Sequence, residues 1–339
     1  NGASRVIAEV NVNAHSNNTD DGYGHGTHVA GIIGGNGNAS NGGYIGIAPK
    51  ANLVNVKVGD DTGAMLESDV VAGIQWIYDN HDTYDIKVVN LSLNTSFYNS
   101  YLLSPLDAAL EILWFNRIVV VVSAGNNGLA ALYPPANDPF VITVGAVDDH
   151  GTASIRDDTI PSYSAYGPTL EGNLKPDLVE PGTNIISDLA GTNSVVYRDH
   201  AGNRVNNNYF RMSGTSMAAP MVAGAVALLL QDEPNLNPDQ VKYRIKATAN
   251  HNIFQWPRYN FLQAGAGYLD IYAAINGRTT QSANTLTLAS LLLWTGRTPP
   301  HWGSMRWDSV NWSSVNWSSV NWSSVNWSSA DWGSDYWSR

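Results

Sequence analysis

The chain of 339 residues is long enough for one large α/β domain or for two domains of ordinary size, and a 43% hydrophobic composition is that of a globular protein. A formal net charge of −11 leaves no basic face for nucleic acid or for an anionic membrane surface. Cysteine is absent, which excludes a disulfide framework and thiolate chemistry, and no apolar run reaches the about 20 residues of a membrane span.

Alternating strands and helices are predicted between residues 50 and 147. Apolar, β-branched runs predict strands at residues 53–58, 86–93, 118–122 and 140–147, and helical spacing predicts helices at 67–78 and 105–115. Such an alternation is typical of a mostly parallel sheet with helices on both faces. In these sheets, sites form at the carboxyl ends of the strands.

The chain after residue 147 is predicted to be irregular, with short strands, until a strongly apolar helix at residues 217–231 that should run through the core. An amphipathic surface helix follows at 238–247 and begins with proline, a favoured first-turn residue. Because the globular pattern ends near residue 277, we expect one domain over residues 1–277 and a linker over residues 278–300.

Residues 301–339 differ in composition from the rest of the chain. The sequence Val-Asn-Trp-Ser-Ser occurs four times from Val310 onward, and tryptophan recurs every five residues from Trp302 to Trp337. A period of five matches neither a helix face nor a strand face, so we expect a low-complexity, disordered tail. The alternatives are an adhesive or sugar-binding segment that uses exposed tryptophan, and a short pentapeptide solenoid.

Two motifs contain the residues of a nucleophilic catalytic site. Ser216 lies in Ser-Gly-Thr-Ser-Met-Ala-Ala-Pro directly before the apolar helix, where backbone N–H groups and the helix dipole favour developing negative charge. The alternative role for Ser216 is an ordinary helix cap. His25 opens a Gly/Ala-rich helix in Gly-His-Gly-Thr-His-Val-Ala-Gly, and histidine is the usual base for a serine nucleophile.

The polar residues of these motifs also have possible roles other than catalysis. His25 and His28 lack the glutamate of a His-Glu-x-x-His zinc site, and His28 is expected to be structural. A third motif, Val-Ser-Ala-Gly-Asn-Asn-Gly, ends a predicted strand, and its Asn126 can donate an N–H group to an oxyanion. Taken alone, Asn126 predicts an Asn-Gly turn, and only the other two motifs favour the oxyanion role.

Together these motifs resemble the subtilase family of subtilisin-like serine proteases, of the bacterial type, over about residues 20–275. The order of histidine, asparagine and serine matches, and so do Gly-Ile-Ala-Pro at Gly46, Val-Asn-Leu-Ser-Leu at Val89 and Lys-Pro-Asp-Leu-Val-Glu-Pro-Gly at Lys175. The resemblance implies an α/β, subtilisin-like three-layer fold with a mostly parallel sheet.

The resemblance also implies the roles of single residues. His25 would be the general base, Ser216 the nucleophile and Asn126 the oxyanion donor. Two backbone walls would border an extended substrate, and they would be made of Ser92, Leu93 and Asn94 on one side and of Ser123, Ala124 and Gly125 on the other.

The family's third catalytic residue is not found. It is an aspartate in an Asp-Thr/Ser-Gly motif some tens of residues before the histidine, and only 24 residues precede His25. Asp61-Thr62-Gly63 follows His25, and Asp20 and Asp21 precede it too closely. We therefore expect an N-terminally incomplete chain that lacks the catalytic aspartate and its strand. This loss would lower kcat by about 10⁴-fold and leave neighbouring strand edges unpaired.

The sequence predicts a serine endopeptidase that hydrolyses peptide bonds through an acyl-enzyme on Ser216. The alternatives are a catalytically inactive subtilase-fold protein that binds peptides, and a surface adhesion protein that acts through the tryptophan repeat. No cofactor is required for the chemistry. A structural calcium ion is left open: loops such as residues 36–41 could contribute ligands, but no Asp-rich loop with ligand spacing appears in the sequence, so no ligand is named. The expected partners are protein or peptide substrates, and no nucleic acid is expected. We expect a secreted monomer, and an intracellular protein is the alternative.

Overall fold

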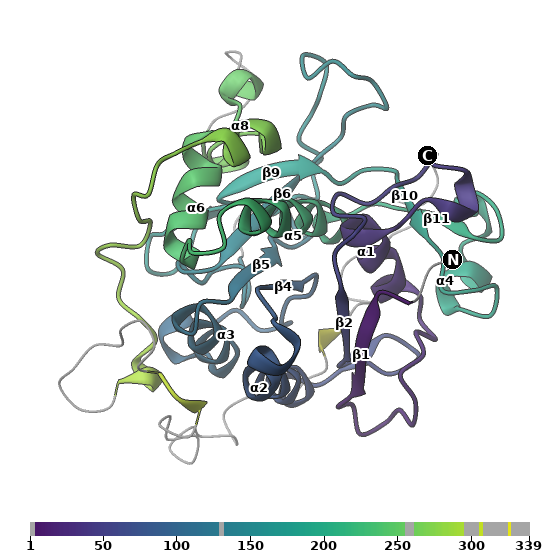
Figure 1. Cartoon of the computed structure of the whole chain (residues 1–339), viewed down its shortest axis with the longest axis horizontal. Coiled ribbons are helices and arrows are strands. Elements are labelled where there is room, and N and C mark those ends of the chain that lie inside the picture. Colours follow the sequence, from purple (N-terminus) through teal and green to yellow (C-terminus); the bar gives the residue numbers. More distant parts are fainter. Residues whose placement is uncertain (1–3, 129–131, 255–260, 295–304, 308–324, 327–339) are drawn as a thin grey trace.

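The structure is a computed structural model, and it describes residues 4–128, 132–254, 261–294, 305–307 and 325–326 (Figure 1). Its central sheet is parallel and contains, in the described part of the chain, β4 (Val88–Leu91), β5 (Val119–Ser123), β6 (Ile142–Val147) and β9 (Leu178–Pro181), in that order. Every residue of β5 and β6 is buried, which is the pattern of strands covered on both faces.

A second parallel sheet lies apart from the central one. It joins β1 (Val6–Asn11) to β2 (Leu53–Lys57). Among the described residues β2 pairs only with β1 and β4 pairs only with β5, so each has one edge without a strand. No strand was predicted before His25, although half-buried and exposed residues alternate through most of β1.

The other strands are short and pair in antiparallel fashion. The pairs are β10 (Ile185–Asp188) with β11 (Tyr209–Met212), β7 (Gly167–Pro168) with β8 (Leu174–Lys175), and β3 (Ala64–Met65) with β12 (Val325–Asn326). The first two pairs lie in the segment between residues 148 and 212, where short strands in irregular structure were expected.

Helices pack against the sheets and against one another. The longer ones are α1 (His25–Gly34), α2 (Glu67–Tyr84), α3 (Pro105–Phe115), α5 (Thr215–Asp232) and α6 (Pro238–Ala247). The described residues also form the short helices α4 (Val195–Asp199), α7 (Phe261–Ala264) and α8 (Ile271–Asn276), and the 3₁₀ turns Asn38–Ser40, Tyr101–Leu103, Ala201–Asn203, His251–Phe254 and Leu291–Leu293. In Figure 1, α2 and α3 lie side by side, as their contacts require.

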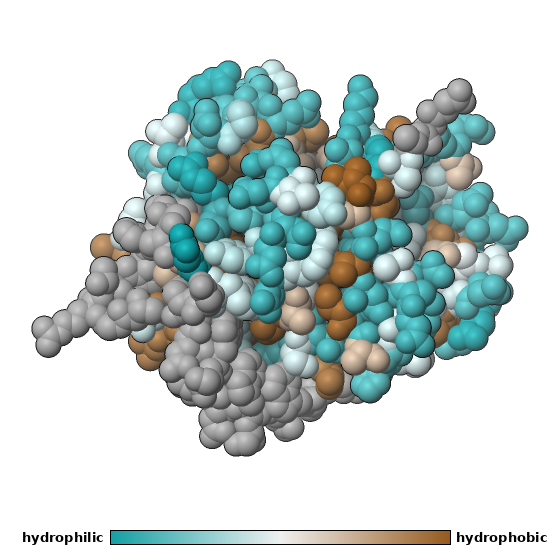
Figure 2. All heavy atoms as spheres, turned by 60° about the horizontal axis from the view of Figure 1, so that its bottom comes forward, coloured by the Kyte–Doolittle hydropathy of each residue, from teal (hydrophilic) through white to brown (hydrophobic). Residues whose placement is uncertain are grey.

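Helix α5 is the core helix that the sequence predicts. It contacts β4, β5, β6 and β9. It is also the one helix of the described ranges long and apolar enough to cross a membrane, but 67% of that stretch is buried inside the protein. Figure 2 shows a face whose described part is mostly hydrophilic, with apolar side chains in separate small groups.

Residues 278–294, predicted to be a linker, lie against the domain. The guanidinium of Arg244 in α6 donates to the carbonyl oxygens of Gly277 and Thr279. The N–H of Ser290 donates to both carboxylate oxygens of Glu111 in α3, at 3.1 and 2.8 Å. Apart from residues 305–307 and β12, the predicted tail at 301–339 lies outside the described residues, so its disorder stays a prediction.

Three carboxyl groups are completely buried near the contact between Ser290 and Glu111. Asp107 and Glu111 of α3 and Asp138 before β6 are each 0% exposed. Burial raises the pKa of Asp107 and of Glu111 well above its ordinary value, and the charge of Asp138 raises both further. A hydrogen bond with Ser104 lowers the pKa of Asp107, but it does not offset the effect of burial. The protein therefore holds Asp107 more easily as the neutral acid.

Asp107→Asn is expected to stabilise the protein at alkaline pH. The pKa of Asp107 is higher in the folded state than in the unfolded chain, where it is about 4, so the wild type loses stability as pH rises from about 4 through the folded value. Asparagine does not ionise, so the variant should gain about 1 to 3 kcal/mol at pH 9 and little at pH 4. Urea unfolding at both pH values measures this, with the exposed Asp82→Asn as control. A gain that is the same at both pH values would contradict the prediction.

Candidate active site

Ser216 is the second residue of α5 and is 6% exposed. The helix follows Gly214, whose φ of 154° is a conformation that side chains disfavour, and a Cβ atom there would lie 3.1 Å from Nδ2 of Asn126. Two contacts join Ser216 to Ser92: Oγ of Ser92 donates to the carbonyl oxygen of Ser216 at 2.9 Å, and Oγ of Ser216 lies 3.4 Å from the carbonyl oxygen of Ser92. The predicted nucleophile and one predicted wall therefore lie together.

Asn126 lies beyond the carboxyl end of β5, where sites form in parallel sheets. Its Oδ1 accepts hydrogen bonds from the N–H and the hydroxyl of Thr215, at 2.9 and 3.0 Å. Because the amide oxygen is bound to the residue before Ser216, the Nδ2 group is the side that remains as a donor beside Gly214. This orientation of the Asn126 side chain is compatible with the role of an oxyanion donor.

The segments predicted as substrate walls lie at the carboxyl ends of two neighbouring strands, β4 and β5. Nδ2 of Asn94 donates to the carbonyl oxygen of Ser123 at 3.2 Å, and the N–H of Gly125 donates to Oγ1 of Thr215 at 3.1 Å. The side chains of Leu93 and Ala124 are buried in apolar clusters. These two residues can therefore face a substrate only through their backbones.

His25 is the first residue of α1 and is buried. Burial lowers the pKa of His25 to about 4, and the negative charge of Asp21 opposes this effect. The imidazole is thus neutral at pH 7 and able to accept a proton. Helix α1 packs against α5, and Val29 and Ile32 share an apolar cluster with Met217, the neighbour of Ser216.

His28 has a different environment, one turn further along α1. It is 0% exposed, and its Nε2 lies 3.1 Å from the carbonyl oxygens of Ile185 and Phe210, which belong to β10 and β11. Burial and the neighbouring His25 lower the pKa of His28 to about 3. These contacts fit the structural role expected for His28.

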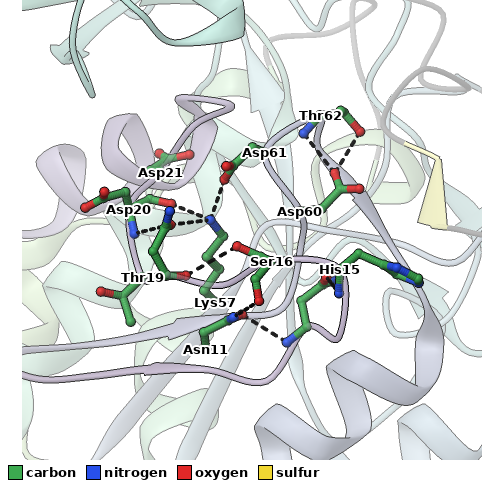
Figure 3. Close-up of polar contacts among 12 residues, drawn as sticks. Asn11, His15, Ser16, Thr19, Asp20, Asp21, Lys57, Asp60, Asp61 and Thr62 are labelled. Carbon is green, nitrogen blue, oxygen red and sulfur yellow. Dashed lines mark hydrogen bonds and ion pairs between the residues drawn. The ribbon is translucent and has the colours of Figure 1, made fainter.

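The aspartates around the ends of β1 and β2 bind groups other than the imidazole of His25 (Figure 3). Asp61 pairs with Nζ of Lys57 at 2.5 Å, and Oδ1 of Asp60 accepts hydrogen bonds from the N–H and the hydroxyl of Thr62. Asp21 binds the backbone beside His25, a role that the sequence analysis missed. The signal was an acidic residue just ahead of a helix start, which is typical of capping.

Calcium has no evident place among these residues. No group of three or more His, Asp or Glu side chains in the described ranges could hold a metal ion. In the loop at residues 36–41, Oδ1 of Asn36 already accepts the N–H of Asn38 at 2.9 Å. No calcium ligand is assigned among the described residues.

Comparisons with known proteins agree on one family. The chain matches the family model described as "Subtilase family" over residues 1–280. It is 44% identical over 249 residues to serine protease AprX from Bacillus subtilis (strain 168), a match that covers 71% of this chain and 56% of AprX. Subtilisin DY from Bacillus licheniformis is 34% identical over 244 residues, which cover 71% of this chain and 75% of that protein.

Solved structures give the same result for the fold. The crystal structure of fervidolysin from Fervidobacterium pennivorans, described as a keratinolytic enzyme related to subtilisin, superposes with a TM-score of 0.61 at 30% identity. That match covers 77% of this chain and 37% of fervidolysin. A cold-adapted subtilisin-like serine proteinase matches with a TM-score of 0.57 at 28% identity, over 78% of this chain and 80% of that one.

Proposed function

This chain belongs to the subtilase family, and from that premise we propose that it is a serine endopeptidase that forms an acyl-enzyme on Ser216. The observation that carries the proposal is the set of contacts at the start of α5, where Asn126 holds Thr215 and Ser92 holds Ser216. Its substrates would be proteins or peptides, and we propose that it acts as a secreted monomer.

The proposed mechanism assigns one role to each residue. His25 removes the proton from Oγ of Ser216 as that atom attacks the peptide carbonyl. The N–H of Ser216 and Nδ2 of Asn126 donate to the resulting oxyanion. His25 then passes the proton to the leaving amine, and water releases the acyl group by the same path in reverse. A pKa of about 4 leaves His25 unprotonated at neutral pH, as the first step requires.

We infer that the catalytic acid is not among the residues that the structure describes. Two observations support this inference: β2 and β4 each have an edge without a strand in the described ranges, and Asp60 and Asp61 are bound to Thr62 and to Lys57. Without that acid the activity of this chain would be low, since an imidazole without its carboxylate loses about 10⁴-fold in kcat.

The test is labelling of Ser216 with a fluorophosphonate probe, which needs a nucleophile and an oxyanion site but no peptide pocket. The folded wild type should be labelled, Ser216→Ala should not, and Ser213→Ala should be labelled like the wild type. Asn126→Asp keeps an oxygen for Thr215 but loses the donor, so its rate should fall about 10²- to 10³-fold, a magnitude that comes from a subtilisin. A folded chain that takes no label, or equal labelling of Ser216→Ala, would refute the proposal.

A further inference from the structure

Asp21 lies in the loop before α1, close to Asp20 and to the Lys57–Asp61 pair (Figure 3). One of its carboxylate oxygens accepts the N–H of Gly24 and the other accepts the N–H of Thr27, both at 2.7 Å. These distances are at the short end of the range for N–H···O bonds, as is usual for a charged acceptor. A single carboxylate therefore holds the backbone on both sides of His25.

The first turn of α1 has no other side-chain cap. The N-cap residue is Gly24, which has a φ of 107° and no side chain to accept the free N–H groups of the turn. A Cβ atom on Gly26 would lie 3.5 Å from Oδ2 of Asp21, so the carboxylate packs directly on the turn that contains His25. Asp21 supplies the cap from outside the helix, where the helix dipole favours an anion.

The charge of Asp21 also acts on the imidazole. Burial lowers the pKa of His25, and the charge of Asp21 raises it. On neighbouring elements, Asp188 of β10 interacts with Arg5, and the charge of Asp199 of α4 acts on Tyr23. The cationic side chains of α4 and β11 are Arg198 and Arg211. If His25 accepts a proton in this buried place, a carboxylate beside it stabilises the cation that forms.

We propose that Asp21 is a positioning residue for His25, because its carboxylate fixes the backbone on both sides of the imidazole and keeps a negative charge beside it. This inference rests on the proposed roles of His25 and Ser216. A cap that served only the stability of α1 would leave the protonation of His25 unchanged, and this difference can be measured.

The experiment uses the full chain and two readouts. NMR titration gives the pKa of His25 without any need for catalysis, with His25→Gln to assign the signal. The rate of fluorophosphonate labelling between pH 3 and 8 gives the reactivity of Ser216. In Asp21→Asn, the pKa of His25 should fall below that of the wild type, the acid limb of the profile should move to lower pH, and the rate at pH 7 should fall about 10-fold.

Matched variants separate charge from capping. Asp20→Asn removes the same charge one residue away. It should leave the pKa of His25 unchanged and should change the labelling rate of Ser216 by no more than twofold. Asp21→Glu keeps the charge and should keep the pKa of His25 close to that of the wild type. Asp21→Ser keeps one capping oxygen without a charge, and it serves in place of Asp21→Asn if that variant does not fold.

An unshifted His25 pKa and acid limb in Asp21→Asn, with a lower rate or a lower Tm alone, would overturn the proposal and leave Asp21 as a cap. If the folded wild type takes no label, the proposed function fails separately. In that case the NMR titration alone decides the role of Asp21: a lowered His25 pKa supports the contact, and an unchanged pKa overturns it.

Discussion

His25→Ala is expected to lower the labelling rate of Ser216 by about 10²- to 10⁴-fold at pH 7, the usual contribution of a general base. The imidazole is buried at the start of α1, and its pKa of about 4 leaves it neutral at this pH. Alanine suits a helix start, so the unfolding transition should stay within a few degrees of the wild type. Labelling reactions that are quenched at successive times, at several probe concentrations, give the labelling rate of Ser216.

His28→Ala provides the matched contrast within the same helix. His28 bridges to carbonyl oxygens of β10 and β11 and is 0% exposed, so its loss leaves a cavity and removes both of these contacts. The expected destabilisation is about 2 to 5 kcal/mol. Reactivity per folded molecule should fall much less than in His25→Ala. If His28→Ala lowers the rate as strongly as His25→Ala in folded protein, the assignment of His25 as the base is wrong.

The largest effect on stability is expected at Asp177. Its carboxylate is 2% exposed and lies 2.8 Å from Nζ of Lys175 and of Lys246 and 3.3 Å from Nζ of Lys242. The N–H of Thr143 also donates to it, at 3.0 Å. Burial alone would raise the pKa of Asp177, but the three lysine charges hold it well below its ordinary value.

Asp177→Ala is therefore expected to destabilise the protein by about 3 to 5 kcal/mol, because it leaves buried lysine charges without a partner. At about 2 to 4 °C per kcal/mol, Tm should fall by about 6 to 20 °C. The lowered pKa means that this contribution is complete above about pH 4 and is lost as pH falls towards the folded-state pKa. The difference between variant and wild type should thus shrink in acid.

Asp85→Asn is the control for that measurement. Asp85 pairs with Lys87 at 2.6 Å, but both side chains are more than half exposed, so the change should stay within about 1 kcal/mol. Asparagine also tolerates the φ of 52° at this helix end. Equal losses in Asp177→Ala and Asp85→Asn would mean that burial does not decide the strength of these ion pairs here.

Local sequence signals were sufficient for several elements. The predicted helices at residues 105–115 and 238–247 agree with α3 and α6, because each has a capping side chain ahead of a proline, Ser104 and Asn237. Helix α2 extends to Tyr84 rather than to residue 78, because its last residues are polar and give no apolar signal. The predicted subtilisin-like fold is confirmed by its similarity to solved subtilisin-like structures.

Strand β1 was not predicted, because local sequence patterns do not reveal pairing between distant segments. It is short and partly exposed, and it is recognised as a strand mainly through its pairing with β2, more than 40 residues away. The edges of β2 and β4 likewise become visible only when the two sheets are seen apart (Figure 1). Pairing between distant segments depends on the closure of long loops and on shared packing, which local patterns do not encode.

The sequence by itself determined the family and the identity of the candidate residues, because each motif is continuous in the chain and its residue types suffice to name its chemistry. Only the tertiary structure decided that Asn126 binds Thr215 through its oxygen, that Asp21 turns back onto the backbone beside His25, and that Asp107 and Asp138 are buried together. Local propensity acts over a few neighbouring residues, whereas the orientation and protonation of these side chains depend on which distant groups the packed core places beside them.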